Sequence, residues 1–158
     1  MPDLLVPLYR LPDRSEGEGA LADQGVGIRR ANTFELTPVL RFIRERFTQS
    51  WADETAAVFA RQPVTCYIAT KGGQVLGFGT YESTRKAFFG PTGVAVEERG
   101  KGIGRALLVA CLWGLHDLGY AYGIIGASGP TEFYVKTVGA IVIPDSTPGV
   151  YTDLLKRD

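Results

Sequence analysis

The chain has 158 residues, of which 45% are hydrophobic and 22% charged, so it is long enough for one domain with a substantial core. Its 17 basic side chains balance 17 acidic ones, and no overall positive field would draw it to nucleic acid or to an anionic membrane. Two cysteines in apolar runs and a single histidine argue against a disulfide framework and a structural zinc site, and we expect no bound metal.

The first 25 residues are expected to form an extension in front of a single domain that covers residues 26–158. Residues 4–9 are apolar enough for a short strand, and Pro7 restricts that strand to a sheet edge because proline has no N–H to donate. Residues 13–25 are polar and lack hydrophobic periodicity, which predicts a linker or long loop. No basic segment precedes a hydrophobic stretch and no apolar run could span a bilayer, so we expect a cytoplasmic protein.

Two helices and a hairpin are expected in the first half of the domain. Apolar residues recur at helical spacing after Thr33, which is the expected cap of the first helix, and a second helix is expected over residues 51–60. Lys71-Gly72-Gly73 is typical of a hairpin turn between two strands. The strands expected in this half are residues 26–30, 65–70, 74–81 and 88–96.

The second half is expected to contain a parallel crossover. Residues 104–118 show a helical pattern that is apolar on most sides and therefore predicts burial, and Gly119 is typical of a helix end. A strand over residues 122–126 would complete a right-handed strand–helix–strand unit. The elements expected after it are a helix over 131–138 and strands over 140–143 and 149–154. We therefore expect an α+β fold of three layers around a mixed, largely antiparallel sheet.

The most informative segment is Arg99-Gly100-Lys101-Gly102-Ile103-Gly104-Arg105, in which glycines alternate with cations just before the long helix. Glycine lets the backbone approach a ligand closely, and a helix start presents unpaired N–H groups and a positive dipole end. The segment therefore predicts a cradle for a pyrophosphate. A Walker loop would need a hydroxyl where Ala106 stands, and the dinucleotide fingerprint would need a glycine where Leu107 stands, so both alternatives fit poorly.

This segment resembles the acetyl-CoA signature of the GCN5-related N-acetyltransferase (GNAT) superfamily, Arg/Gln-x-x-Gly-x-Gly/Ala, as Arg99-x-x-Gly102-x-Gly104. Val94-Ala95-Val96-Glu97 is similar to the family stretch Val-x-Pro-Glu, with valine in place of proline. The order of strands and helices from residue 27 to 155 also resembles the family's fold. The resemblance implies acetyl-CoA as co-substrate, with the backbone of Val94 and Val96 pairing with its pantetheine and acetyl end. The residues implied to hold its pyrophosphate are Arg99, Gly100, Lys101, Gly102, Ile103, Gly104 and Arg105.

A second segment, Phe133-Tyr134-x-x-x-x-Gly139-Ala140, resembles the Phe-Tyr-x-x-x-Gly-Phe stretch of many family members, with one extra residue before the glycine. In the family pattern the tyrosine directs its phenol at the CoA sulfur, which makes Tyr134 the candidate general acid. A thiol has a pKa of about 8.5 and a phenol one of about 10, so proton transfer from tyrosine to a departing thiolate is nearly balanced. The alternative is a structural tyrosine on a helix face.

The acceptor and the general base stay open in the sequence. Glu82 and Glu132 are candidates for the base, although each is more typical of a solvated surface carboxylate. Trp51 follows a helix break and is a candidate wall of the acceptor pocket, and Tyr151 is a candidate to point into the substrate channel. Ser128-Gly129-Pro130 is expected to shape the cleft between the parallel strands, with no chemical role assigned to the serine.

These observations predict an N-acetyltransferase that moves an acetyl group from acetyl-CoA to a primary amine by direct attack. Neither Cys66 nor Cys111 stands in an electropositive turn, which argues against an acyl-enzyme. The alternative is a non-catalytic acyl-CoA-binding module that reports CoA status to a partner. Both would keep the cradle, but only the enzyme needs Tyr134. No nucleic-acid or membrane partner is expected, and the sequence leaves a homodimer open.

Overall fold

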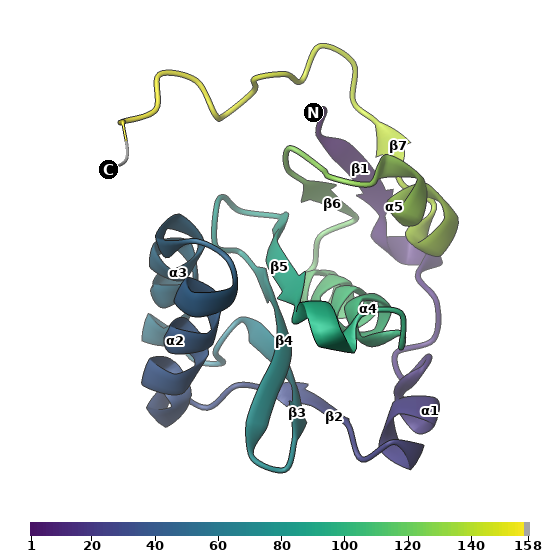
Figure 1. The fold of residues 1–158 in the computed structure, drawn as a ribbon. Helices are drawn as coiled ribbons and strands as arrows, with labels where there is room; N and C mark the ends of the chain where they lie inside the picture. Colours follow the sequence, from purple (N-terminus) through teal and green to yellow (C-terminus); the bar gives the residue numbers. More distant parts are fainter. Residues whose placement is uncertain (157–158) are drawn as a thin grey trace.

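The computed structural model describes residues 1–156, which contain a sheet of seven strands in the order β2-β3-β4-β5-β6-β1-β7 (Figure 1). All neighbouring strands are antiparallel except β5 and β6, which are parallel. The expected mixed, largely antiparallel sheet is therefore confirmed. The strands are β1 (Leu4–Pro7), β2 (Gly27–Arg30), β3 (Cys66–Lys71), β4 (Gln74–Tyr81), β5 (Phe88–Val94), β6 (Tyr122–Ile125) and β7 (Ile141–Val142).

Helices cover both faces of the sheet and give three layers (Figure 1). On one face, α2 (Leu36–Arg46) and α3 (Gln49–Ala56) share a buried apolar cluster with β3 and β4. On the other face lies the long helix α4 (Ile103–Asp117), which packs in two further clusters. The remaining helical segments are α1 (Glu18–Asp23), α5 (Thr131–Val138) and the 3₁₀ turns η1 (Leu8–Arg10), η2 (Thr33–Glu35), η3 (Ala57–Ala60) and η4 (Val96–Glu98).

Helix α4 is held tightly against the sheet because its sequence is apolar on nearly every side. Ten of its 15 residues are buried, as the sequence predicts. Gly114 allows the closest approach, since a Cβ there would lie 2.4 Å from Cζ of Tyr81 on β4. Any larger residue would push the helix away from the sheet. The start of α4 lies beside the end of β5, since a Cβ on Gly104 would be 3.6 Å from Cγ2 of Val94.

The parallel pair of strands separates soon after it begins. Only Phe88 and Phe89 of β5 pair with β6. Among residues 1–156, the rest of β5, up to Val94, has no paired strand on the edge that faces β6. The chain leaves β6 at Gly126 and turns away. Backbone groups on the two diverging segments therefore face a gap in the sheet, where a ligand can meet them.

Strand β1 lies inside the sheet, between β6 and β7, and the edge position expected from Pro7 is wrong. The proline fits there because β7 pairs only with Leu4 and Leu5. Pro7 lies beyond the end of β7, so no ladder bond is required of it on that side. Leu4 and Val6 are fully buried, which places this strand in the core.

Three other expectations are wrong. Part of the expected loop over residues 13–25 forms α1, whose Leu21 is buried. Residues 149–154 form no strand. The helical turn η2 is capped by Asn32 and not by Thr33. The backbone N–H of Asn32 donates to the Glu35 carboxylate at 2.8 Å. None of the helices in residues 1–156 is long and apolar enough to cross a membrane.

Candidate active site

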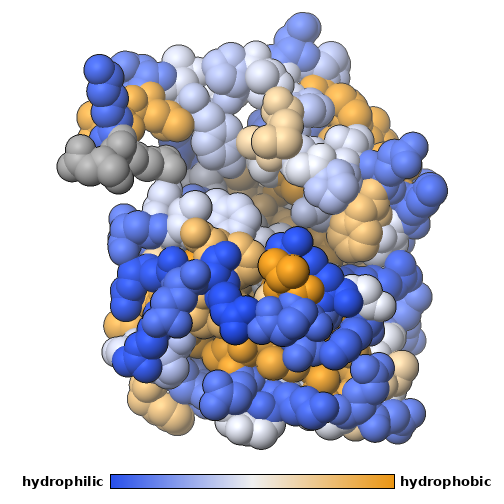
Figure 2. Space-filling model, viewed as in Figure 1, coloured by the Kyte–Doolittle hydropathy of each residue, from blue (hydrophilic) through white to orange (hydrophobic). Residues whose placement is uncertain are grey.

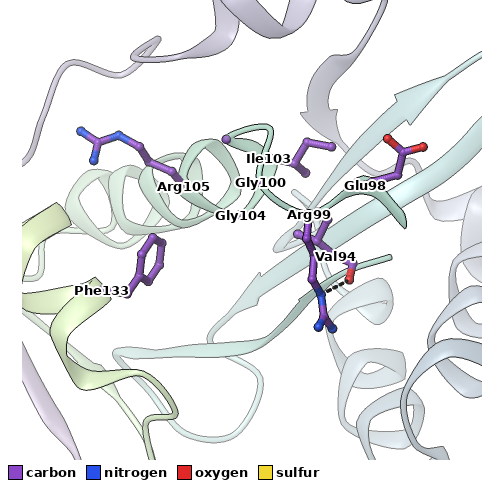
Figure 3. A pocket seen from close by; sticks show the side chains of 9 residues that line it. Val94, Glu98, Arg99, Gly100, Ile103, Gly104, Arg105 and Phe133 are labelled. Carbon is purple, nitrogen blue, oxygen red and sulfur yellow. Dashed lines mark hydrogen bonds between the residues drawn. The ribbon is translucent and has the colours of Figure 1, made fainter. Parts of the chain in front are cut away.

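The loop between β5 and α4 surrounds a cavity of about 340 Å³, here called the first cavity (Figure 3). Gly100 and Gly102 have φ angles of 79° and 90°, a left-handed backbone that other residues rarely adopt. In the described part of the chain, no atom beyond their two neighbours lies within 4 Å of the place where a Cβ on Gly100 or Gly102 would stand. Gly102 precedes α4, and no side chain of residues 1–156 caps this helix, so its first N–H groups are available to an anion. The backbone itself therefore provides a phosphate cradle.

The cations around the first cavity contact neighbouring groups instead of converging on one point. Arg99 donates its Nε–H to a backbone carbonyl of β5 at 3.3 Å (Figure 3). Lys101 pairs with Glu98 at 2.6 Å, and Arg105 pairs with Glu16 at 2.5 Å. Because these ion pairs are partly exposed, each contributes little free energy, and a phosphate can compete for the cations.

Most of the residues that the sequence assigns to acetyl-CoA line the first cavity, but Val96 and Lys101 do not. The side chain of Val96 is 70% exposed, and that of Lys101 lies beside Glu98. Phe133 adds a wall from α5 that the cradle motif did not indicate. The lining residues are Val94, Glu98, Arg99, Gly100, Gly102, Ile103, Gly104, Arg105 and Phe133.

A second cavity, of about 280 Å³, lies where β5 and the chain after β6 diverge. Phe133 lines the first cavity and the next residue, Tyr134, lines the second, so α5 borders both. No carboxylate or amine side chain lines the second cavity among residues 1–156. Its lining residues are Met1, Trp51, Phe89, Gly90, Pro91, Thr92, Ile125, Gly126, Ala127, Ser128, Gly129, Pro130 and Tyr134.

Tyr134 is the residue of the second cavity that is best suited to donate a proton. Its side chain is 8% exposed and contacts Phe89 and Phe133 edge-on, with ring centroids 6.5 and 5.2 Å away. Burial raises the pKa of its phenol, which therefore stays protonated at neutral pH. Within residues 1–156 no group hydrogen-bonds to this hydroxyl, so the proton is available to a bound molecule.

A third cavity, of about 290 Å³, adjoins the second and shares Trp51, Phe89 and Gly126 with it among other residues. Glu54 of α3, Thr84 and Tyr151 line the third cavity only. The hydroxyl of Tyr151 lies over the cleft, because a Cβ on Gly126 would be 2.5 Å from it. In the space-filling view the surface is hollowed between the C-terminal segment and the helices below it (Figure 2).

The N-terminal residues hold one wall of the second cavity in place. The side chain of Asp3 is buried, and its Oδ1 accepts the N–H of Ala127 at 2.8 Å. Ala127 has a φ of 44°, which is strained for a residue with a Cβ. The carbonyl of Pro2 accepts bonds from the N–H and the hydroxyl of Ser128 at 3.0 and 3.1 Å. The residues in front of β1 therefore hold the chain after β6 in its path.

The two candidate bases of the sequence analysis lie away from the three cavities. The carboxylate of Glu82 accepts hydrogen bonds from the Tyr120 hydroxyl at 2.8 Å and from the Ala87 N–H at 2.6 Å. Glu132 is exposed on α5. Neither is a lining residue of these cavities. The structure instead brings Glu54 to the third cavity, and its position three residues after Trp51 on the same helix is the one sequence signal that could have indicated it.

The acetyltransferase (GNAT) family matches residues 34–125, more than half of the sequence, and the chain belongs to this family. No curated protein matches it. The structure has the GNAT fold, and solved structures of similar fold extend over most of the chain.

Three of these structures are a glucosamine N-acetyltransferase region of a fungal multi-domain β-N-acetylglucosaminidase, a GCN5-related N-acetyltransferase from Sphaerobacter thermophilus, and a GNAT family acetyltransferase from Brucella melitensis in complex with acetyl-CoA. The fungal region is 17% identical, with a TM-score of 0.72 over 90% of this chain and 19% of that chain. The Sphaerobacter protein is 18% identical, with a TM-score of 0.67 over 90% of this chain and 48% of that chain. The Brucella protein is 20% identical, with a TM-score of 0.56 over 75% of this chain and 88% of that chain. This chain therefore spans less than half the length of the first two proteins.

Proposed function

We propose that this protein transfers an acetyl group from acetyl-CoA to a primary amine by direct attack of the amine. The observation that carries the proposal is the arrangement of three spaces: the phosphate cradle, the second cavity with Tyr134, and the third cavity with Glu54. Helix α5 borders the first two, and the third adjoins the second. A donor held at the first could present its acyl group in the second, where an acceptor entering from the third would meet it. Membership of an acetyltransferase family and the acetyl-CoA complex of the Brucella protein support the choice of donor.

The donor would be held by backbone groups more than by fixed charges. The free N–H groups at the start of α4 and the open space over Gly100 and Gly102 fit a pyrophosphate. Arg99 and Arg105 line the same cavity and would add charge-assisted hydrogen bonds once their present partners are exchanged. The unpaired side of β5 up to Val94 offers backbone groups to the pantetheine.

In the transfer step the amine nitrogen forms a bond to the acetyl carbon and loses its proton to water, while the carbon–sulfur bond breaks. The departing sulfur would take its proton from the hydroxyl of Tyr134, which water later restores. A route through a cysteine is disfavoured, since burial raises the pKa of Cys66 to about 12 and that of Cys111 well above its ordinary value. These buried free thiols also suit a reducing compartment, and we propose the cytoplasm.

Release of free thiol from acetyl-CoA, measured with a panel of monoamines, diamines, amino acids, aminoglycosides and peptide N-termini, tests this function. Amine-dependent release above the hydrolytic background is the expected result. Calorimetric titration with acetyl-CoA is run in parallel. Tight binding with no release for any amine would favour the non-catalytic acyl-CoA-binding module. Absence of binding to any CoA ester would overturn both functions.

A further inference from the structure

We infer that the third cavity binds a second cationic group of the acceptor and that Glu54 selects it. The inference rests on the proposed acetyl transfer and specifies its substrate class. The acceptor would carry two amino groups on one flexible chain: one would enter the second cavity and be acetylated, and the other would stay protonated beside Glu54.

Glu54 lies on α3 and is held by two hydroxyl groups of the loop that follows β4. Thr84 donates its hydroxyl to Oε2 of Glu54, and Ser83 donates its hydroxyl to the Glu54 backbone carbonyl at 2.5 Å. Within residues 1–156 the carboxylate forms no ion pair, and its Oε1 accepts no hydrogen bond. A half-buried carboxylate that is held in place but lacks a cation is a suitable partner for an ammonium group.

Tyr151, which lines the third cavity with Glu54, lies near charges of both signs. Burial raises the pKa of the Tyr151 phenol, and the nearby negative charges of Glu54 and Asp3 raise it further. Arg85 acts on that pKa in the opposite direction. Its guanidinium donates to the carbonyl of Thr84 at 2.9 Å. Glu54 is therefore the one acidic side chain among residues 1–156 that lines the third cavity, and its carboxylate has no ion-pair partner there.

The two cavities place the binding points for the amino groups apart. Tyr134 lines only the second cavity and Glu54 only the third. Between them, Trp51 and Phe89 line both, and aromatic faces attract cations as well as alkyl chains. An acceptor with a single amino group can fill one of the two points, whereas a diamine can fill both.

Binding of three small amines to the full chain saturated with CoA tests this inference by calorimetry. The probes are 1,4-diaminobutane, 1-aminobutane and 4-aminobutanoate, which differ in charge at the far end of a similar chain. We expect the diamine to bind about tenfold more tightly than the monoamine, and the anionic probe to bind weakest. Glu54→Gln should abolish the advantage of the diamine, because the amide oxygen can still accept the Thr84 hydroxyl but carries no charge to attract a second ammonium group.

The matched control is Asp53→Asn, which removes one negative charge from the same helix outside the third cavity. Asp53 accepts a bond from Gln49 at 2.8 Å, and its variant should keep the full diamine advantage. Equal affinities for diamine and monoamine in the unmodified protein would overturn the inference, as would an advantage that survives Glu54→Gln. Since binding needs no turnover, a diamine advantage without thiol release would contradict the proposed function and leave the cation site standing.

Discussion

At the scale of single residues, Tyr134 is the side chain on which the proposed chemistry depends. Tyr134→Phe keeps the ring that contacts Phe89 and removes only the hydroxyl. We expect turnover to fall by about a hundredfold or more, as for the loss of a general acid, while affinity for acetyl-CoA stays unchanged because the cradle belongs to the first cavity. Steady-state thiol release and calorimetry measure the two effects.

The control for this variant is Tyr122→Phe, which removes a hydroxyl from an exposed tyrosine of β6 outside the three cavities. It should leave both turnover and binding as they are. If Tyr134→Phe turned over a good amine substrate at the full rate, Tyr134 would be a structural residue and the proton would have to come from elsewhere.

Asp3 is a positioning residue, since it acts on the cleft through Ala127. Asp3→Ala would leave the Ala127 N–H without its partner and its left-handed backbone without support, so we expect a loss of about 1–3 kcal/mol in the free energy of unfolding and lower turnover. Asp3→Asn keeps an oxygen acceptor and should restore most of both. Urea unfolding and thiol release are the measurements; equal defects in the two variants would show that the charge, not the hydrogen bond, matters.

The parts of the site that the sequence indicated are those made of adjacent residues. The cradle was visible because its glycines and the start of α4 are contiguous, and Tyr134 because it belongs to a short motif. Glu54 and Asp3 carried no such signal. Their roles depend on contacts with Thr84 and Ala127, which are distant in the chain and which spacing alone does not reveal.

At the scale of elements, the turn that leads into α2 offers a test of pH dependence. Glu35 accepts two bonds from Arg29, at 2.8 and 2.6 Å, and one from the Asn32 N–H. The ion pair with Arg29, aided by Asn32, lowers the pKa of Glu35 from 4.5 to about 2. A carboxyl whose pKa falls on folding stabilises the protein above its unfolded pKa, and this stabilisation is lost as the pH falls toward 2.

Glu35→Gln should therefore reduce the free energy of unfolding by about 1 kcal/mol at pH 7, a value limited by solvent screening of a partly exposed pair. The difference between variant and unmodified protein should shrink as the pH is lowered from 4.5 to 2. Chemical unfolding followed by circular dichroism at pH 7 and pH 3 measures it. A deficit that is the same at both values would show that hydrogen-bond geometry alone stabilises this turn.

Elements with strong periodicity were predicted correctly, and those without it were not. The hairpin turn between β3 and β4 and the apolar surface of α4 are local signals, and both are confirmed. Helix α1 has one buried apolar residue, too few to produce a period. The internal position of β1 depends on where β7 ends, which no local pattern around Pro7 contains.

At the scale of the whole molecule, we propose that the first 25 residues fold as part of the same unit as the rest. Four of their large apolar side chains are almost completely buried: Leu4, Val6, Leu8 and Leu21. Burial of each contributes about 1.5–3 kcal/mol, and the sum approaches the total stability of a typical domain. A chain that lacks residues 1–25 should therefore show no cooperative thermal unfolding by calorimetry. If the shortened chain unfolded at the same midpoint temperature as the full chain, residues 1–25 would be a separate extension, as the sequence analysis predicts.

The bond between Ala127 and Asp3 joins residues that lie 124 positions apart, and it has a consequence for how the protein acquires its activity during folding. The β5–α4 loop can form from neighbouring segments, whereas the wall beside Tyr134 requires the N-terminal residues to reach a segment more than a hundred positions further along the chain. Contacts between such distant segments form late, because closing a long loop costs entropy before any contact compensates. We therefore expect a refolding chain to form the β5–α4 loop early and to gain acyl transfer only when the residues in front of β1 have reached Ala127.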